Sequence, residues 1–367
     1  MAMQAAVFRQ AFEPVAIESV ELDAPRSREV LVRTVATGVC HSDLHLVDGD
    51  MKWPTSDPIV LGHEGAGVVE AVGDKVTSVG PGDHVVACLS GFCGLCPQCL
   101  TGHPNRCIGR IVNRGRGATP RLSLEGKPLT QFADIGSYAE QMLLHENSLV
   151  RIDDDIPLDR AALVGCGVLT GVGAALRTSG LRPGETVAVF GCGGVGLSVI
   201  QGARIGGARR IIGIDRFDSK LEMATALGAT DTINSSDDDP VALIRSLTGG
   251  EGVDHAFEAV GVASLVRQAV ESLAIGGTAT IVGVLPTGAM IEFPWEALRP
   301  ECKLQTSRMG SNRFRIDIPR YLDFYRQGRL LLDEMISRRG DLADINDAFR
   351  AMKAGEVART VLMFDEA

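Results

Sequence analysis

The segment from Thr186 to Gly206 constrains the fold of this chain more than any other. An apolar stretch, Val187–Phe190, leads into Gly191-Cys192-Gly193-Gly194-Val195-Gly196 and then into a helical pattern, which fits the spacing G-x-G-x-x-G. That pattern alone is weak, but here it follows a predicted strand and opens a predicted helix. The glycines permit a tight turn and let a pyrophosphate approach the helix N-terminus. Asp215 ends the next predicted strand, 19 residues after Gly196, where an acid would bind ribose hydroxyls.

Strands and helices alternate from about Val168 onward, which predicts βαβ units and a parallel sheet covered by helices on both faces. The predicted strands are Thr186–Phe190, Ile211–Asp215, Asp231–Ile233, His255–Glu258 and Thr278–Val282, and the helices include Leu197–Ile205 and Lys220–Leu227. After roughly Gly310 the pattern becomes helical again, over Tyr321–Arg326 and Ile345–Lys353, before a last strand, Thr360–Phe364. We expect this tail to pack on the N-terminal domain.

The first hundred residues are typical of a compact β-rich domain. Short Val- and Ala-rich strands are separated by glycine-containing turns. The predicted strands are Met3–Phe8, Val30–Thr37, Gly65–Val72 and Asp83–Ala87. A polar stretch from Arg110 to Gln131 is expected to be a long surface excursion.

Four cysteines between these regions have the spacing C-x2-C-x2-C-x7-C: Cys93, Cys96, Cys99 and Cys107. Four thiolates close a tetrahedral zinc site that leaves no room for a substrate, so the site would be structural. An iron–sulfur cluster is the competing interpretation, but its common bacterial run has a shorter last gap and a following proline. Four unliganded core cysteines are the remaining alternative.

A second set of metal-type ligands is spread along the chain in glycine contexts: Cys40, His63 and Cys166. Two thiolates and one imidazole would leave the fourth zinc position open for chemistry. A metal there lowers the pKa of bound water to about 7, and an alcohol oxygen should respond similarly. The resulting zinc-bound alkoxide can expel a hydride. Because Cys166 directly precedes the nucleotide-binding region, we expect the metal to lie beside the cofactor.

A proton must then leave a buried site, and Ser42 and His45 are candidates for this relay. They are three residues apart and share a face if this segment is helical. Asp43 and Glu64 are candidates to orient the ligating His63. The alternatives are an exposed helix histidine at position 45 and solvated surface carboxylates at positions 43 and 64.

Composition narrows the functional class. The chain has 367 residues and a net charge of −10, which argues against nucleic acid or an anionic membrane surface as a partner. It contains no apolar run of about 18 residues, and Met1–Val7 does not resemble a signal peptide. We therefore expect a cytoplasmic protein, and in a reducing compartment the clustering of four of the nine cysteines indicates a metal site rather than disulfides.

The combination of motifs resembles the zinc-containing medium-chain alcohol dehydrogenases along essentially the whole chain. The resemblance rests on Gly62–Gly67, Cys40–Asp43, the four-cysteine lobe, Gly191–Gly196 and Glu356–Leu362. The Cys2His ligand set is also the one known from this family. The resemblance implies an α/β protein with a GroES-like catalytic domain over residues 1–167, including a structural zinc lobe at 88–107. It further implies a Rossmann domain over 168–305 and a return to the catalytic domain over 306–367.

Further roles are implied by the resemblance alone. His41 and Arg359 are expected to contact the pyrophosphate, and Lys220 the adenosine ribose, with exposed charges as the alternative. Trp53, Leu89 and Phe132 are expected to line an apolar substrate pocket. The long segment between Cys107 and Cys166 favours a homodimer over a homotetramer.

The sequence therefore predicts an NAD-dependent enzyme with two zinc ions per chain that reversibly oxidises a small apolar alcohol. A primary alcohol is expected, with secondary and aromatic alcohols also open. The alternative is a specialised aldehyde or polyol dehydrogenase, or a glutathione-dependent formaldehyde dehydrogenase, of the same family. The formaldehyde class typically has an acid at the position of Trp53 and an arginine near Ile111, and this chain has neither. A non-catalytic zinc and nucleotide binder is the alternative outside the enzymes.

Overall fold

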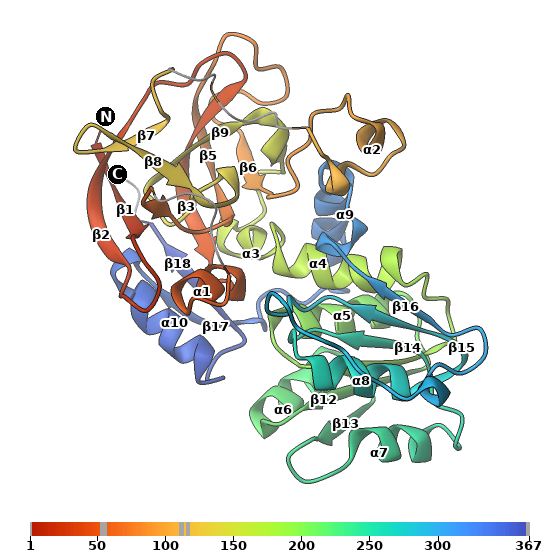
Figure 1. The fold of residues 1–367 in the computed structure, drawn as a ribbon. Coiled ribbons are helices and arrows are strands. Elements are labelled where there is room, and N and C mark those ends of the chain that lie inside the picture. The colour runs from red at the N-terminus through yellow and green to blue at the C-terminus, as the bar shows by residue number, and fades with distance from the viewer. Residues whose placement is uncertain (1, 52–56, 110–113, 115–117, 365–367) are drawn as a thin grey trace. The chain divides into compact units, whose positions relative to one another are not determined.

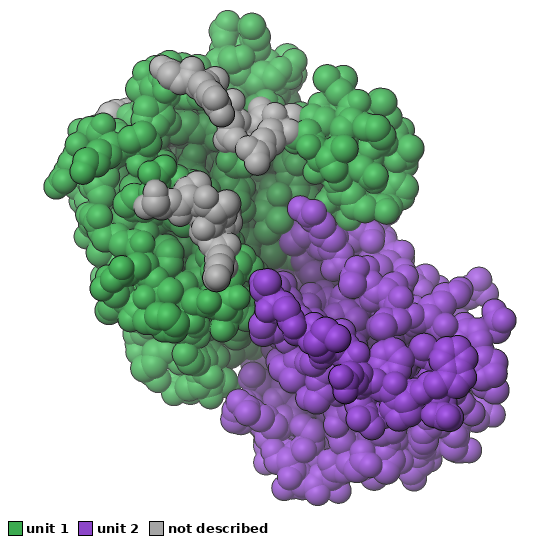
Figure 2. All heavy atoms as spheres, viewed as in Figure 1, with its two compact units in different colours: residues 1–166, 313–323, 335–367 green, residues 167–312, 324–334 purple. Residues whose placement is uncertain are grey.

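The chain forms two compact units in the computed structural model, which describes residues 2–51, 57–109, 114 and 118–364 (Figures 1 and 2). Unit 1 comprises residues 1–166, 313–323 and 335–367, and unit 2 comprises residues 167–312 and 324–334. The predicted domain limits after residues 167 and 305 stay a prediction about separately folding domains. No helix in the described part of the chain is long and apolar enough to cross a membrane.

Unit 1 contains a small closed barrel with the strand order β1-β2-β7-β8-β4. Its strands are β1 (Ala2–Phe8), β2 (Ala16–Leu22), β4 (Ile59–Val60), β7 (Leu122–Leu124) and β8 (Lys127–Gln131). Apolar side chains from these strands, among them Val7, Val20, Leu122 and Leu129, form one buried cluster. Closure satisfies the backbone groups that an open sheet would leave at its edges.

The second sheet of unit 1 has the order β10-β6-β5-β3-β18-β17, with β9 also pairing with β3. Its strands are β3 (Glu29–Gly38), β5 (Glu64–Val72), β6 (His84–Ala87), β9 (Gln141–His145), β10 (Leu149–Arg151), β17 (Ile336–Gly340) and β18 (Arg359–Met363). Antiparallel pairing of Val361 with Gly38 confirms that the C-terminal tail packs on the N-terminal region.

The α-helices of unit 1 are short except for the two near the C-terminus. They are α1 (His41–Val47), α2 (Pro97–Leu100), α3 (Leu158–Leu163), α9 (Phe314–Arg326, whose last residues belong to unit 2) and α10 (Ile345–Lys353). The amphipathic α10 buries Ile345, Ala348 and Phe349 in a cluster that also contains Leu44 and Leu46 of α1. This packing fixes α1, which begins directly after Cys40.

Unit 2 is built on a six-stranded parallel sheet with the order β13-β12-β11-β14-β15-β16. The strands are β11 (Thr186–Phe190), β12 (Arg210–Asp215), β13 (Asp231–Asn234), β14 (Val253–Glu258), β15 (Leu273–Ile281) and β16 (Lys303–Thr306). The helices are α4 (Gly167–Gly173), α5 (Gly194–Ile205), α6 (Asp218–Leu227), α7 (Pro240–Leu247) and α8 (Ala263–Glu271). Strand order reverses between β11 and β14, and ligands of such sheets bind at the carboxyl ends of the strands at this point.

The prediction of a surface excursion from Arg110 to Gln131 was wrong for its second half. Residues 122–131 form the hairpin β7–β8 of the barrel, with Leu122 and Leu129 buried. Glu125 and Gly126 both have positive φ values, 52° and 75°, as a tight hairpin turn requires. The apolar pattern of two such short strands was too brief to recognise among the surrounding polar residues.

Candidate metal centres and cofactor cradle

The side chains of Cys40, His63, Glu64 and Cys166 converge in unit 1, where one potential ligand atom of each lies within 4.8 Å of all the others. Cys40 caps the N-terminus of α1, His63 directly precedes β5, and Cys166 follows α3. All four residues are buried. The structure therefore brings together the three predicted zinc ligands, together with the glutamate that was expected to orient His63.

His63 is held in place by Asp43, the other residue predicted to orient it. The Nδ1 atom of His63 lies 3.1 Å from an Asp43 carboxylate oxygen, and both side chains are fully buried. The same carboxylate accepts hydrogen bonds from the backbone N–H of Gly62, at 2.8 Å, and from the Tyr138 hydroxyl, at 3.0 Å. Gly62 has a φ of +90°, and an added Cβ would lie 2.5 Å from the Tyr138 nitrogen. Only glycine lets the chain approach Asp43 in this way.

The chemistry of this cluster fits a metal cation. The Nε2 atom of His63 is buried without a hydrogen-bond partner among the described residues. Although burial opposes protonation, the Asp43 carboxylate and Cys40 raise the pKa of His63 to about 10. A raised pKa in a buried site means that the surrounding groups stabilise a positive charge there. Two thiolates and an imidazole oriented by a carboxylate are the donors that zinc prefers.

Glu64 and Arg359 form a buried ion pair beside this cluster. Arg359 is the first residue of β18 and is 5% exposed. The pair joins two residues that are 295 positions apart in the sequence. The structure thus places Arg359 next to the ligand cluster, while its predicted contact with a pyrophosphate stays a prediction.

The relay candidates lie on α1, which is helical as predicted. The Ser42 hydroxyl lies 3.9 Å from the sulfur of Cys40. His45 is one helical turn further on, with its Nδ1 atom 3.2 Å from an Asp50 carboxylate oxygen. His41 is exposed at the start of the helix, and its ring centroid lies 6.3 Å from that of His45.

The structure describes two of the three predicted pocket residues. Phe132 is buried with its ring edge-on to the His63 imidazole, at a centroid distance of 5.3 Å. Leu89 is half-buried and packs beside the apolar cluster under β3 and β5. Trp53 lies outside the described residues.

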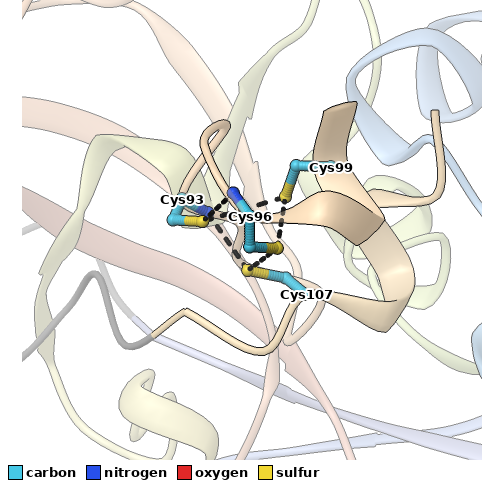
Figure 3. A group of neighbouring side chains, drawn as sticks. All are labelled: Cys93, Cys96, Cys99 and Cys107. Carbon is cyan, nitrogen blue, oxygen red and sulfur yellow. Dashed lines mark hydrogen bonds between the residues drawn. The ribbon is translucent and has the colours of Figure 1, made fainter. Parts of the chain in front are cut away.

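The four sulfur atoms of the cysteine lobe face one another (Figure 3). The Sγ atoms of Cys96 and Cys99 are 3.5 Å apart, those of Cys96 and Cys107 are 3.9 Å apart, and those of Cys93 and Cys99 are 4.0 Å apart. A tetrahedral zinc site with Zn–S bonds of about 2.3 Å requires sulfur separations of about 3.8 Å. All four thiols are free, so the spacing fits a metal and excludes disulfides in this state.

Backbone N–H groups of the lobe donate to the sulfurs. The N–H groups of Leu95 and Cys96 donate to Cys93 Sγ, and the N–H of Cys93 donates to Cys107 Sγ. Such donors favour the thiolate over the thiol, and they lower the pKa of Cys93. These donors therefore favour the deprotonated form of Cys93, which is the form that a metal binds.

The predicted cradle has the expected strand–turn–helix structure in unit 2. Gly191, with a φ of +96°, follows β11, Gly193 caps α5, and the helix continues through Gly194, Val195 and Gly196. An added Cβ on Gly196 would lie 1.7 Å from the carbonyl oxygen of Gly191, so no other residue fits there. The helix α5 has twelve residues, counted from Gly194, and the N–H groups at its N-terminus offer a site for an anion.

Asp215 ends β12 and is tied to the cradle by its carboxylate. One carboxylate oxygen accepts a hydrogen bond from the backbone N–H of Cys192 at 2.8 Å. The other oxygen accepts a hydrogen bond from the backbone N–H of Arg216, also at 2.8 Å. Lys220 and Arg216 both lie over the Phe217 ring, 5.1 and 4.7 Å from its centroid. The structure therefore brings Asp215 and Lys220 to the same edge of the sheet as the glycines.

Two residues of this site were missed in the sequence. Tyr138 binds Asp43 across 95 positions of the sequence, and no local motif marks it. Asp50 is only five residues from His45. An acid at that spacing does not indicate a contact with the histidine unless the chain is known to reverse after the helix.

Comparisons with known proteins agree with this geometry. Residues 26–154 match the family model described as "Alcohol dehydrogenase GroES-like domain", and residues 194–327 match "Zinc-binding dehydrogenase". The chain is 38% identical to "Alcohol dehydrogenase class-3" of Myxine glutinosa, over 98% of this chain and 97% of that protein. It is also 38% identical to "S-(hydroxymethyl)glutathione dehydrogenase" of Saccharomyces cerevisiae, over 99% and 96% of the two chains.

A solved structure is similar over the full length. The benzyl alcohol dehydrogenase of Acinetobacter calcoaceticus matches with a TM-score of 0.92 and 33% identity, covering all of both chains. The first match contains Cys40, His63 and the four-cysteine lobe, and the second begins at Gly194 of the cradle. Fold, ligand clusters and relatives agree that the chain belongs to the family of zinc-containing medium-chain alcohol dehydrogenases.

Proposed function

We propose that this protein is an NAD-dependent dehydrogenase for a small, apolar primary alcohol, with secondary and aromatic alcohols as further candidates. The observation that carries the proposal is the convergence of Cys40, His63 and Cys166 around a buried imidazole nitrogen that has no hydrogen-bond partner among the described residues. We also propose a cytoplasmic location, a compartment in which thiols stay reduced, and two zinc ions per chain, one in each ligand cluster.

Cys40, His63 and Cys166 would hold the catalytic zinc, which supplies Lewis-acid chemistry toward a hydroxyl group. Asp43 lies 3.1 Å from Nδ1 of His63, which would leave Nε2 as the nitrogen that binds the metal. Ser42 lies beside Cys40, where its hydroxyl can accept the proton of an alcohol and pass it on. His45, part-exposed at the end of α1, receives this proton and releases it to solvent.

The cofactor would bind at the glycine cradle of unit 2. The N-terminus of α5 offers N–H groups to the pyrophosphate, and Asp215 offers a carboxylate to the ribose hydroxyls. His41, Lys220 and Arg359 are proposed as further contacts on the grounds of family resemblance. NAD would accept the hydride when bound.

The apolar character of the proposed substrate rests on the side chains near the metal cluster. Phe132 packs against His63, and Leu89 is half-buried. The similar structure named for benzyl alcohol supports an aromatic alcohol as a candidate. The decisive test is a panel of alcohols with purified protein and NAD, followed by absorbance of the reduced nicotinamide.

A second candidate is oxidation of S-(hydroxymethyl)glutathione, the compound named in the yeast relative. This substrate is anionic and would need a cation in the pocket, whereas the described pocket residues are apolar. Formaldehyde with and without glutathione separates the two candidates. Activity that appears only with glutathione would contradict the lead proposal.

The relay predicts unequal losses from two substitutions. Ser42→Ala should lower kcat by roughly 10²–10⁴-fold, the usual contribution of a general acid–base step. His45→Gln should lower kcat by a smaller factor, because water can replace His45 as the second group of the relay. The loss should fall mainly at the acidic end of the pH–rate profile. The measurement is kcat as a function of pH in both variants. Profiles equal to the parent in both would end the relay proposal.

We further propose that the protein is a homodimer joined through unit 2. β16 is an edge strand of the six-stranded sheet, and Leu304 on it is 42% exposed. Met290 and Trp295, in the connection from β15 to β16, are 77% and 79% exposed. An open edge flanked by exposed apolar side chains favours pairing with another chain.

Light scattering should therefore give twice the mass of one chain. Leu304→Glu should shift the mass toward the monomer, because it places a charge beside the paired edge. Ile17→Glu, at an exposed apolar position on β2 of unit 1, is the matched control and should stay dimeric. A parent protein that is monomeric or tetrameric contradicts the proposal.

A further inference from the structure

The carboxylate of Asp50 reaches His45 because the chain reverses after α1. Asp48 ends the helix, Gly49 takes a φ of +76°, and the N–H of Met51 donates to the carbonyl oxygen of His45 at 3.0 Å. This turn brings Asp50 Oδ2 to 3.2 Å from His45 Nδ1. The contact is thus fixed by backbone hydrogen bonds on both sides of it.

A carboxylate at Nδ1 selects one form of the imidazole. An ionised carboxylate only accepts hydrogen bonds, so Nδ1 must carry the proton and Nε2 becomes the basic nitrogen. The His45 side chain is 23% exposed and that of Asp50 is 51% exposed. The imidazole is therefore partly sheltered, while the carboxylate reaches solvent.

Other charged groups near His45 are engaged elsewhere or more distant. Asp48 binds Lys353 of α10 through both carboxylate oxygens at 2.9 Å. The ring of His41 is 6.3 Å away between centroids. Asp43, on the same helix, is buried against His63 and Tyr138. In the described part of the chain, Asp50 is thus the carboxylate in contact with the His45 ring.

We propose that Asp50 is a positioning residue of the proton relay, which holds His45 with Nε2 as the proton acceptor. The proposal rests on the proposed function, because it requires His45 to receive the proton that leaves the substrate hydroxyl. Nε2 gains this proton, the imidazolium is balanced by the Asp50 carboxylate, and the same proton is then lost to water. Asp50 itself stays ionised throughout.

Asp50→Asn tests the proposal, with Asp48→Asn as the matched control. Asparagine offers both an acceptor and a donor, so it no longer selects one tautomer of His45. The control removes the same charge two residues away but leaves the contact with His45 intact. The chain has seven histidines, so ¹⁵N-histidine labelling gives few signals, and the signal absent from His45→Gln identifies His45.

In Asp50→Asn, the His45 signal should show a mixture of tautomers, because the asparagine side chain no longer requires the proton to lie on Nδ1. Alcohol oxidation near neutral pH should fall by up to about fivefold in kcat, with little change in KM. Asp48→Asn should match the parent in the tautomer of His45 and in kcat.

Two outcomes would overturn the proposal, and they can be told apart. A parent-like tautomer and kcat in Asp50→Asn, together with an altered pH–rate profile in His45→Gln, refute the role of Asp50 and leave the relay standing. A parent-like pH–rate profile in His45→Gln removes His45 from the relay, and the role of Asp50 fails with it.

Discussion

Replacing Cys166 by serine should abolish turnover while the chain stays folded. Serine keeps the size of the side chain but replaces a soft thiolate by a hydroxyl that zinc binds poorly at neutral pH. Cys166 is buried within the ligand cluster of unit 1, and no disulfide depends on it. We expect kcat to fall by roughly three orders of magnitude or more, since the Lewis acid is lost. Elemental analysis should give two zinc ions per chain in the parent and one in this variant.

Cys107→Ser is the companion variant, because it removes a thiolate from the other cluster. Loss of the structural site should lower the free energy of unfolding by about 3 kcal/mol. For a unit of this size, this lowers the midpoint of thermal unfolding by roughly 6–12 °C. Cys302→Ser controls for cysteine replacement in general, since Cys302 lies outside both clusters. A Cys107→Ser protein as stable as the parent would show that the lobe is not a structural metal site.

Asp215→Ala should remove most of the preference for NAD over NADP. The 2′-phosphate of NADP would meet the Asp215 carboxylate as a like charge, and at about 4 Å with an effective dielectric constant near 20 the repulsion is roughly 4 kcal/mol. Solvent and salt reduce this value. Retaining about 2.7 kcal/mol gives roughly a hundredfold preference in the parent. Arg216 could bind the phosphate instead, but its guanidinium is stacked on Phe217.

The structure indicates that Asp215→Ala also weakens NAD binding in a second way. Asp215 also accepts the backbone N–H of Cys192, so alanine loosens the glycine turn and should weaken NAD binding directly. Asp215→Asn keeps an acceptor for that N–H and should lose less NAD affinity than alanine does. Asp218→Ala is the control, because Asp218 binds Asn234 at the start of α6. The measurement is kcat/KM with both cofactors, and a parent that prefers NADP would refute the assignment.

Local patterns in the sequence were sufficient for much of the fold. β11 and α10 have the predicted limits, because each is a continuous apolar or amphipathic run bounded by glycine or a charged turn. The two ligand clusters could also be anticipated, because cysteine and histidine in glycine contexts are few in this chain. Their convergence is shown by the structure, while their metals stay a prediction.

Long-range partners could not be predicted, because a single sequence has no signal for contacts between distant positions. The Tyr138 hydroxyl on Asp43 and the pairing of Arg359 with Glu64 depend on the register of β3, β5 and β18. The prediction from the sequence missed the hairpin β7–β8 for another reason. Its strands have three and five residues, which is too short for an alternating pattern to stand out.

The position of β18 also determines when the metal cluster of unit 1 can be completed. This strand lies between β3 and β17 and carries Arg359, the buried partner of Glu64. It leaves the ribosome later than β3 and β5 and later than Cys40, His63 and Cys166, which all come earlier in the sequence. During synthesis the nascent ligand cluster therefore lacks its buried counter-charge, and the parallel sheet of unit 2 is translated in the interval. Closure of the cluster therefore waits for Arg359, so chains truncated before β18 would leave Glu64 without its cation.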